Sequence, residues 1–86
     1  MDFVDPDSLR AHLMARDPMQ RVVALHAIEL ELQQARRAEV ARLADEVQRF
    51  TERGIPYYAP DTRRYRGWVS RAVSYWERLH RAAGTS

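Results

Sequence analysis

The chain has 86 residues, a length suited to one domain with a modest core, and its 45% content of hydrophobic residues argues against general disorder. It has no cysteine, which excludes disulfides and thiolate metal sites, and no apolar run long enough to cross a membrane. Because the N-terminal residues are acidic and lack an apolar run, we expect no signal peptide and a soluble cytoplasmic protein.

The charge of the chain is unevenly distributed. Residues 1–53 carry eight arginines against ten acidic residues, whereas residues 54–86 carry six arginines against two, so that the C-terminal part has a net charge of +4. This asymmetry predicts a C-terminal face that attracts anions. All 14 basic residues are arginine, and neither lysine nor asparagine occurs, which is typical of a GC-rich genome and indicates a bacterial protein.

The predicted fold is all-α, a compact four-helix domain that comprises residues 1–86. The expected helices span residues 6–16, 18–34, 38–53 and 62–82, with an extended connector over residues 55–60. In the first helix, Asp5 is a favoured N-cap and Pro6 suits the first helical position. Its buried stripe is expected to consist of Leu9, Leu13 and Met14.

Asp17 and Pro18 repeat the same start signal for the second helix. Its apolar positions form two faces, so we expect this helix to be central in the core. One face holds Met19, Val22, Val23, His26 and Leu30, and the other holds Leu25, Ile28 and Leu32. Residues 17–28 resemble the opening helix of a HEAT-type repeat, but the pattern occurs once, so the sequence predicts no repeat array.

The stretch from Gln33 to Glu39 allows two interpretations, because no glycine or proline interrupts it. One helix over residues 18–53 would be about 54 Å long, more than so small a domain can cover with its own apolar surface. We therefore expect a turn around residues 34–37. The alternative, an uninterrupted helix, would require a partner chain.

The third helix shows one narrow apolar stripe and a clear end. Val40, Leu43, Ala44, Val47 and Phe50 follow helical spacing. Gly54 then suits the left-handed position after a helix, Ile55 suits the apolar contact that follows it, and Pro56 prevents continuation.

The last helix is expected to begin after an N-cap at Asp61 or Thr62. Gly67 inside it is unfavourable by about 1 kcal/mol relative to alanine, which predicts a close helix crossing or contact with the connector at this point. The apolar stripe consists of Tyr65, Trp68, Val69, Ala72, Trp76 and Leu79, with Val73 and Tyr75 at its flanks.

The sequence contains no recognisable catalytic arrangement. No serine lies in a glycine-flanked elbow, no glycine-rich phosphate loop occurs, and the neighbouring carboxylates do not face each other on a helix. His26 with Glu29, and Glu77 with His80, have spacings used by metal ligands, but they fall short of the set that a di-iron bundle needs. We therefore expect no enzyme activity, no cofactor and no metal.

The candidate binding residues lie in the C-terminal part. Arginines at the start of the last helix favour anions, and a tyrosine pair in an extended connector leaves one ring exposed. The predicted partner-binding residues are Tyr57, Tyr58, Arg63, Arg64, Arg66 and Tyr75.

These features predict a small interaction or regulatory domain that binds a protein partner or itself, without contact to a membrane. The first alternative is a nucleic-acid-binding protein whose last helix contacts phosphates through Arg63, Arg64, Arg66 and Arg71. A third possibility is an accessory subunit of an enzyme.

Overall fold

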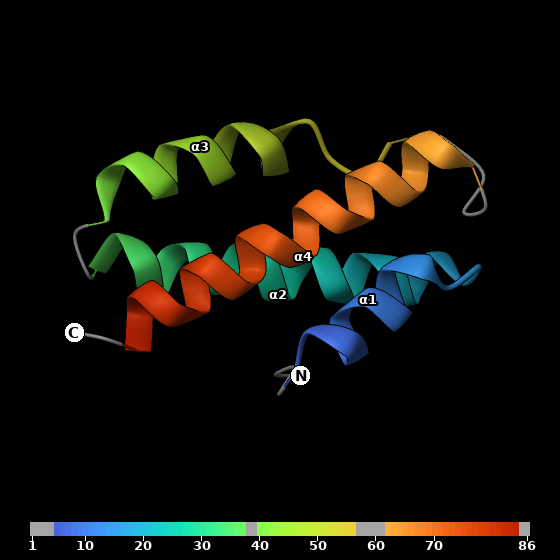
Figure 1. Cartoon of the computed structure of the whole chain (residues 1–86), viewed down its shortest axis with the longest axis horizontal. Coiled ribbons are helices and arrows are strands. Elements are labelled where there is room, and N and C mark those ends of the chain that lie inside the picture. The colour runs from blue at the N-terminus through green and yellow to red at the C-terminus, as the bar shows by residue number, and fades with distance from the viewer. Residues whose placement is uncertain (1–4, 38–39, 57–61, 85–86) are drawn as a thin grey trace.

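Four α-helices make up the protein in the computed structural model, which describes residues 5–37, 40–56 and 62–84 (Figure 1). The helices are α1 (Pro6–Met14), α2 (Pro18–Arg37), α3 (Ala41–Glu52) and α4 (Arg63–Gly84). The described residues contain no strand, and the predicted all-α four-helix architecture is confirmed. No helix in this described part is long and apolar enough to cross a membrane.

Helix α2 lies at the centre of the arrangement, as predicted. It contacts α1, α3 and α4, and α4 in turn contacts α1 and α3. Figure 1 shows α4 crossing in front of α2, with α3 along one side of this pair and α1 on the other. The later part of α3 lies beside the middle of α4, where Phe50 contacts Trp68 and Tyr75.

Both N-terminal helices begin at the predicted caps. The Asp5 carboxylate accepts a hydrogen bond from the backbone N–H of Ser8 at 2.7 Å, and the Asp17 carboxylate accepts one from Met19 at 3.0 Å. Helix α1 ends two residues earlier than expected, at Met14, because Ala15 is already extended with ψ of 147°. An extended residue here separates the first helix from the capping residue of the second.

The break between the second and third helices falls later than predicted. Helix α2 continues to Arg37 instead of ending at residue 34, and α3 begins at Ala41 instead of residue 38. The backbone N–H of Val40 donates to the carbonyl of Ala35 at 3.3 Å, which closes the end of α2. Because Ala35 is fully buried, the last turn of α2 belongs to the core. A single uninterrupted helix is excluded.

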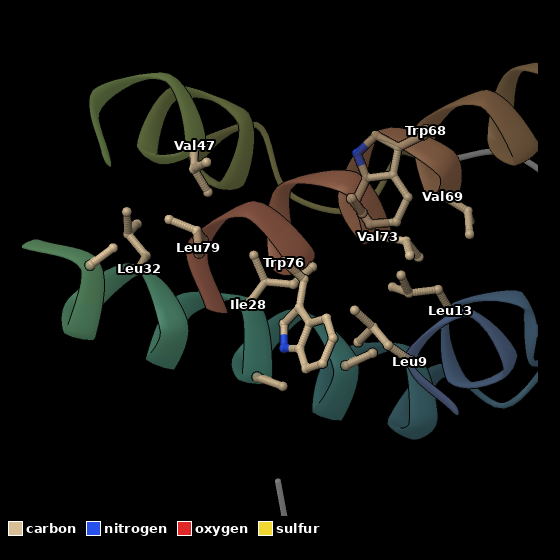
Figure 2. Packing of buried hydrophobic residues seen from close by; sticks show 14 of the residues in the cluster. Leu9, Leu13, Ile28, Leu32, Val47, Trp68, Val69, Val73, Trp76 and Leu79 are labelled. Atoms are coloured by element: carbon tan, nitrogen blue, oxygen red, sulfur yellow. The ribbon is translucent and has the colours of Figure 1, made fainter. Parts of the chain in front are cut away.

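The predicted stripe of α4 forms the largest part of the core. Figure 2 shows Trp76 of α4 close to Leu9 of α1 and Ile28 of α2. Trp68 and Trp76 are only 6% and 3% exposed, so both rings belong to the core, as expected. The buried residues are Leu9, Leu13, Ala24, Ala27, Ile28, Leu32, Ala35, Ala44, Val47, Tyr65, Trp68, Val69, Ala72, Val73, Trp76 and Leu79.

One of the two apolar faces assigned to α2 is wrong in three of its five residues, whereas Val23 of that face packs against the core. Met19 is 66% exposed and Val22 is 54% exposed, and the His26 side chain is 66% exposed at 4.0 Å from Glu29. The buried face consists of Ala24, Ala27, Ile28, Leu32 and Ala35. Alanines occupy three of these positions, and such small side chains let a neighbouring helix approach closely.

The C-terminal end of α3 and the start of α4 follow the predicted signals. Gly54 has a φ of 71°, its N–H donates to the Thr51 carbonyl at 2.9 Å, and Ile55 packs against the core. At the start of α4, the hydroxyl oxygen of Thr62 accepts a hydrogen bond from the backbone N–H of Tyr65 at 3.2 Å. Helix α4 then continues to Gly84, two residues beyond the predicted end.

Candidate functional site

An open pocket of about 410 Å³ lies where the end of α3 faces the first turns of α4. It is lined by Pro56, Arg63, Arg64, Gly67, Trp68 and Arg71. Pro56 directly follows the turn that ends α3, and the other five residues belong to α4. We call this feature the arginine pocket.

Helical spacing explains why these α4 residues share one surface. Arg64, Gly67, Trp68 and Arg71 stand at positions i, i+3, i+4 and i+7, which fall on one side of an α-helix. A Cβ atom placed on Gly67 would meet no heavy atom of the described residues within 4 Å. A close helix crossing at Gly67 is therefore absent among them, and the alternative prediction, contact with the connector, falls mainly on residues 57–60, which lie outside the described residues. Gly67 lines the pocket and leaves room in it.

Aromatic packing holds the pocket wall in place. The Trp68 ring stacks on Phe50 of α3 with a centroid distance of 5.4 Å and an interplanar angle of 16°. It also meets the buried ring of Tyr65 at 5.8 Å. Because Trp68 is 94% shielded by these neighbours and the rest of the core, it offers a fixed edge rather than a mobile platform.

The pocket is cationic, and among the described residues its lining includes three arginines and no acidic side chain. The ion pairs within the described part of the chain join His26 to Glu29 and His80 to Glu31. Arg63 and Arg71 are exposed, and neither guanidinium has a carboxylate of the described residues within 4.0 Å. Neither of these two arginines therefore pairs with a described acid of α3, and Asp61, which precedes α4, lies outside the described residues.

Tyr75 lies one turn beyond Arg71 and ties α4 to α3. Its hydroxyl donates to the Glu46 carboxylate at 2.7 Å, and its ring contacts Phe50 at 5.1 Å. The hydrogen bond to Glu46, together with partial burial, raises the pKa of Tyr75 above its usual 10.0. The guanidinium of Arg78 lies 5.7 Å from the centre of the same ring. Tyr75 is thus half-buried and already has partners in its own chain.

The structure brings together only some of the residues predicted to bind a partner. Arg63 and Arg64 line the pocket, whereas Arg66 is exposed and does not line it. Tyr57 and Tyr58 lie outside the described residues. The predicted partner-binding set omitted Gly67, Trp68 and Arg71, although the spacing of these residues with Arg64 was visible in the sequence.

Two other polar features lie outside the arginine pocket. His80 lies 3.0 Å from Glu31 and stacks on Trp76 with a centroid distance of 5.1 Å, so it bridges α4 and α2. A shallow pocket of about 310 Å³ on α3 is lined by Asp45, Gln48, Arg49 and Glu52. Within the described ranges, no group of three or more histidine, cysteine, aspartate or glutamate side chains is placed to hold a metal ion.

Comparison with known proteins found no matching family model, no matching curated protein and no matching solved structure. The resemblance of residues 17–28 to a HEAT-type helix therefore carries no family assignment.

Proposed function

We propose that this protein is a non-enzymatic interaction domain that binds an acidic segment of a partner protein in the arginine pocket. One observation supports the proposal: Arg63, Arg64 and Arg71 line one open concave surface, and none of the described residues that line it is acidic. Guanidinium groups bind carboxylates with two parallel hydrogen bonds, and arginine is enriched at protein interfaces.

The composition of the pocket supports a protein ligand. Trp68 and Pro56 add apolar surface beside the charges, and anchored aromatic groups next to arginine are typical of the residues that dominate interface energies. Because Trp68 is fixed by Phe50, little conformational entropy is lost when a ligand contacts it.

The surroundings of the pocket weigh against the nucleic-acid alternative. Glu46, next to Tyr75, is exposed on the α3 side of this surface, and Asp45 and Glu52 are exposed farther around α3. A nucleic-acid strand carries a phosphate at every nucleotide and would bring charge next to these carboxylates, whereas a peptide can place an uncharged residue beside Glu46. Arg66, one of the four arginines in that alternative, does not line the pocket.

The proposal is tested by fluorescence anisotropy with a labelled peptide rich in aspartate and glutamate. We expect Arg71→Glu to weaken binding about tenfold or more, because it turns an attractive contact into a repulsive one. Arg66→Glu is the matched control, since it makes the same charge change on the same helix outside the pocket. Its effect on affinity should be small.

A second titration with duplex DNA separates the alternatives. Four phosphate contacts would give a log–log salt slope of about −3.6. Tight DNA binding with that slope, lost in Arg66→Glu as well as in Arg71→Glu, would replace the proposal by the nucleic-acid function. Equal peptide affinity of the Arg71→Glu variant and the parent chain would remove the arginine pocket as a binding site.

A further inference from the structure

Three arginines form a regular row along α4 that extends beyond the arginine pocket. Arg64 and Arg71 line the pocket, and Arg78 follows after another seven residues. Seven residues are nearly two helical turns, so the three side chains lie along one side of the helix, about 10.5 Å apart at 1.5 Å per residue. We call these residues the arginine row.

Aromatic surface lies beside this row. The Arg78 guanidinium is 5.7 Å from the centre of the Tyr75 ring, and Tyr75 contacts Phe50 of α3. Both rings are only partly buried. The row is therefore bordered, between Arg71 and Arg78, by apolar surface at the boundary of α3 and α4.

From this spacing, and resting on the proposed function, we propose that the acidic segment is an α-helix with a carboxylate at every seventh residue on one face. The helix would lie along α4, with two carboxylates at Arg64 and Arg71 of the arginine pocket and the third at Arg78. An apolar side chain between the carboxylates would contact Tyr75 and Phe50. Helices with the same rise keep such charges in register, because positions i, i+7 and i+14 repeat at the same 10.5 Å or so.

An extended segment fits the row less well. A strand rises about 3.3 Å per residue, so a 10.5 Å step corresponds to about three residues. Residues three apart on a strand point to opposite faces, because side chains alternate with a period of two. Consecutive arginines of the row could not then be met from one face of the strand.

A second copy of the same chain also fits less well. Asp45 and Glu52 of α3 are exposed carboxylates seven residues apart, which is the required spacing. However, Arg49 lines the same shallow pocket as these two acids. In a dimer it would face the arginine row of the other copy, and like charges across an interface are unfavourable.

The experiment compares peptides of about three heptads that differ in the arrangement of identical residues. The first peptide is a hydrocarbon-stapled helix with glutamate at every seventh position and leucine between. The second is equally stapled and has the same composition, but its glutamates are distributed around the helix. The proposal expects the first peptide to bind at least about tenfold more tightly than the second.

Variants of Arg78 distinguish the row from the pocket alone, because Arg78 does not line the pocket. Arg78→Glu should weaken the regular peptide about tenfold and leave a short acidic peptide, which reaches only the pocket, unchanged. Arg78→Lys keeps the charge and should restore most of the affinity. Arg66→Glu is again the matched control, and thermal melting of each variant checks that the fold is intact.

The outcomes of these experiments distinguish the proposed pocket function from the proposed helical partner. If acidic peptides bind and Arg71→Glu weakens them, but both stapled peptides bind equally and Arg78→Glu has no effect, the helical partner is wrong and the pocket function stands. If no acidic peptide binds, the proposed function fails and the helical partner with it. If light scattering detects a dimer that Arg78→Glu dissociates, the occupant is a second copy and the inference is overturned.

Discussion

The hydroxyl of Tyr65, in the first turn of α4, donates a hydrogen bond to the backbone carbonyl of Leu13, at the end of α1. Both residues are fully buried. The last carbonyl groups of a helix have no hydrogen-bond donor within that helix. The Tyr65 hydroxyl of α4 therefore supplies the donor for the Leu13 carbonyl of α1. This bond joins the first and last helices of the domain.

Tyr65→Phe should destabilise the protein by about 1–3 kcal/mol, because phenylalanine preserves the ring but leaves the buried Leu13 carbonyl without this donor. Urea unfolding gives the free energy of unfolding for the comparison. Tyr75→Phe is the matched control: it also removes one hydroxyl, but the Glu46 carboxylate that accepts its bond is exposed to water. If the two variants lose equal stability, the bond to Leu13 has no special role.

Stability should fall at alkaline pH through the same tyrosine. Burial raises the pKa of Tyr65 above 10.0, although the nearby Arg21 lowers it in part. The folded state therefore holds this proton more tightly than the unfolded state. The resulting stability is fully present below about pH 10 and is lost as the pH rises through the folded-state pKa.

The chain is well suited to this measurement, because it has no lysine and no cysteine. Tyrosines are thus the side chains that titrate between about pH 9 and pH 12. Thermal melting across this range should show a decrease in melting temperature, and the decrease should be smaller in Tyr65→Phe. Parallel curves for the parent chain and the variant would assign the alkaline loss to other tyrosines, such as Tyr75.

Trp76→Ala should cost about 3–5 kcal/mol, the range for truncating a large buried aromatic side chain. The ring is 3% exposed and lies close to Leu9 and Ile28. Chemical denaturation measures the loss, with Trp76→Phe as the milder variant that retains a ring. An unchanged midpoint for Trp76→Ala would contradict the assignment of this ring to the core.

The sequence predicted the helices well where capping residues and periodicity agreed. Asp5, Gly54 and Thr62 each mark a helix end that the structure confirms. The end of α2 was misplaced, because no residue between 33 and 39 is a helix breaker. The burial of Ala35, a tertiary effect, decides that α2 continues to Arg37.

The face of α2 was harder to predict than its existence. Met19 and Val22 are more hydrophobic than Ala24 and Ala27, so hydrophobicity alone assigns them to the core. The structure buries the alanines instead, because close packing between helices requires small residues as well as apolar ones. Single exposed apolar residues are ordinary on a protein surface.

The candidate site was only partly predictable for a related reason. The cluster of arginines was visible in the sequence, but residues within one helical turn point in different directions, so closeness in sequence does not tell which of them line one pocket. Arg63 and Arg64 therefore line the pocket while Arg66 does not. Trp68 was assigned to the core alone, although a ring buried on one side can still present an edge to a pocket.

Gly67→Ala should change the stability of the protein and its affinity for an acidic peptide in opposite directions. Alanine is favoured over glycine inside a helix by about 0.8–1.0 kcal/mol, and a Cβ at Gly67 meets no described atom within 4 Å. The variant should therefore be more stable than the parent chain. Because Gly67 lines the arginine pocket, the added methyl group should also lower the affinity for an acidic peptide several-fold.

Gly54→Ala is the control for the effect on stability. Gly54 has a φ of 71°, a conformation that costs about 1–2 kcal/mol for residues with a Cβ, so this variant should be less stable. It lies outside the pocket lining and should retain peptide affinity while it remains folded. A Gly67→Ala protein with higher stability and undiminished peptide binding would mean that the glycine does not keep the pocket open for a ligand.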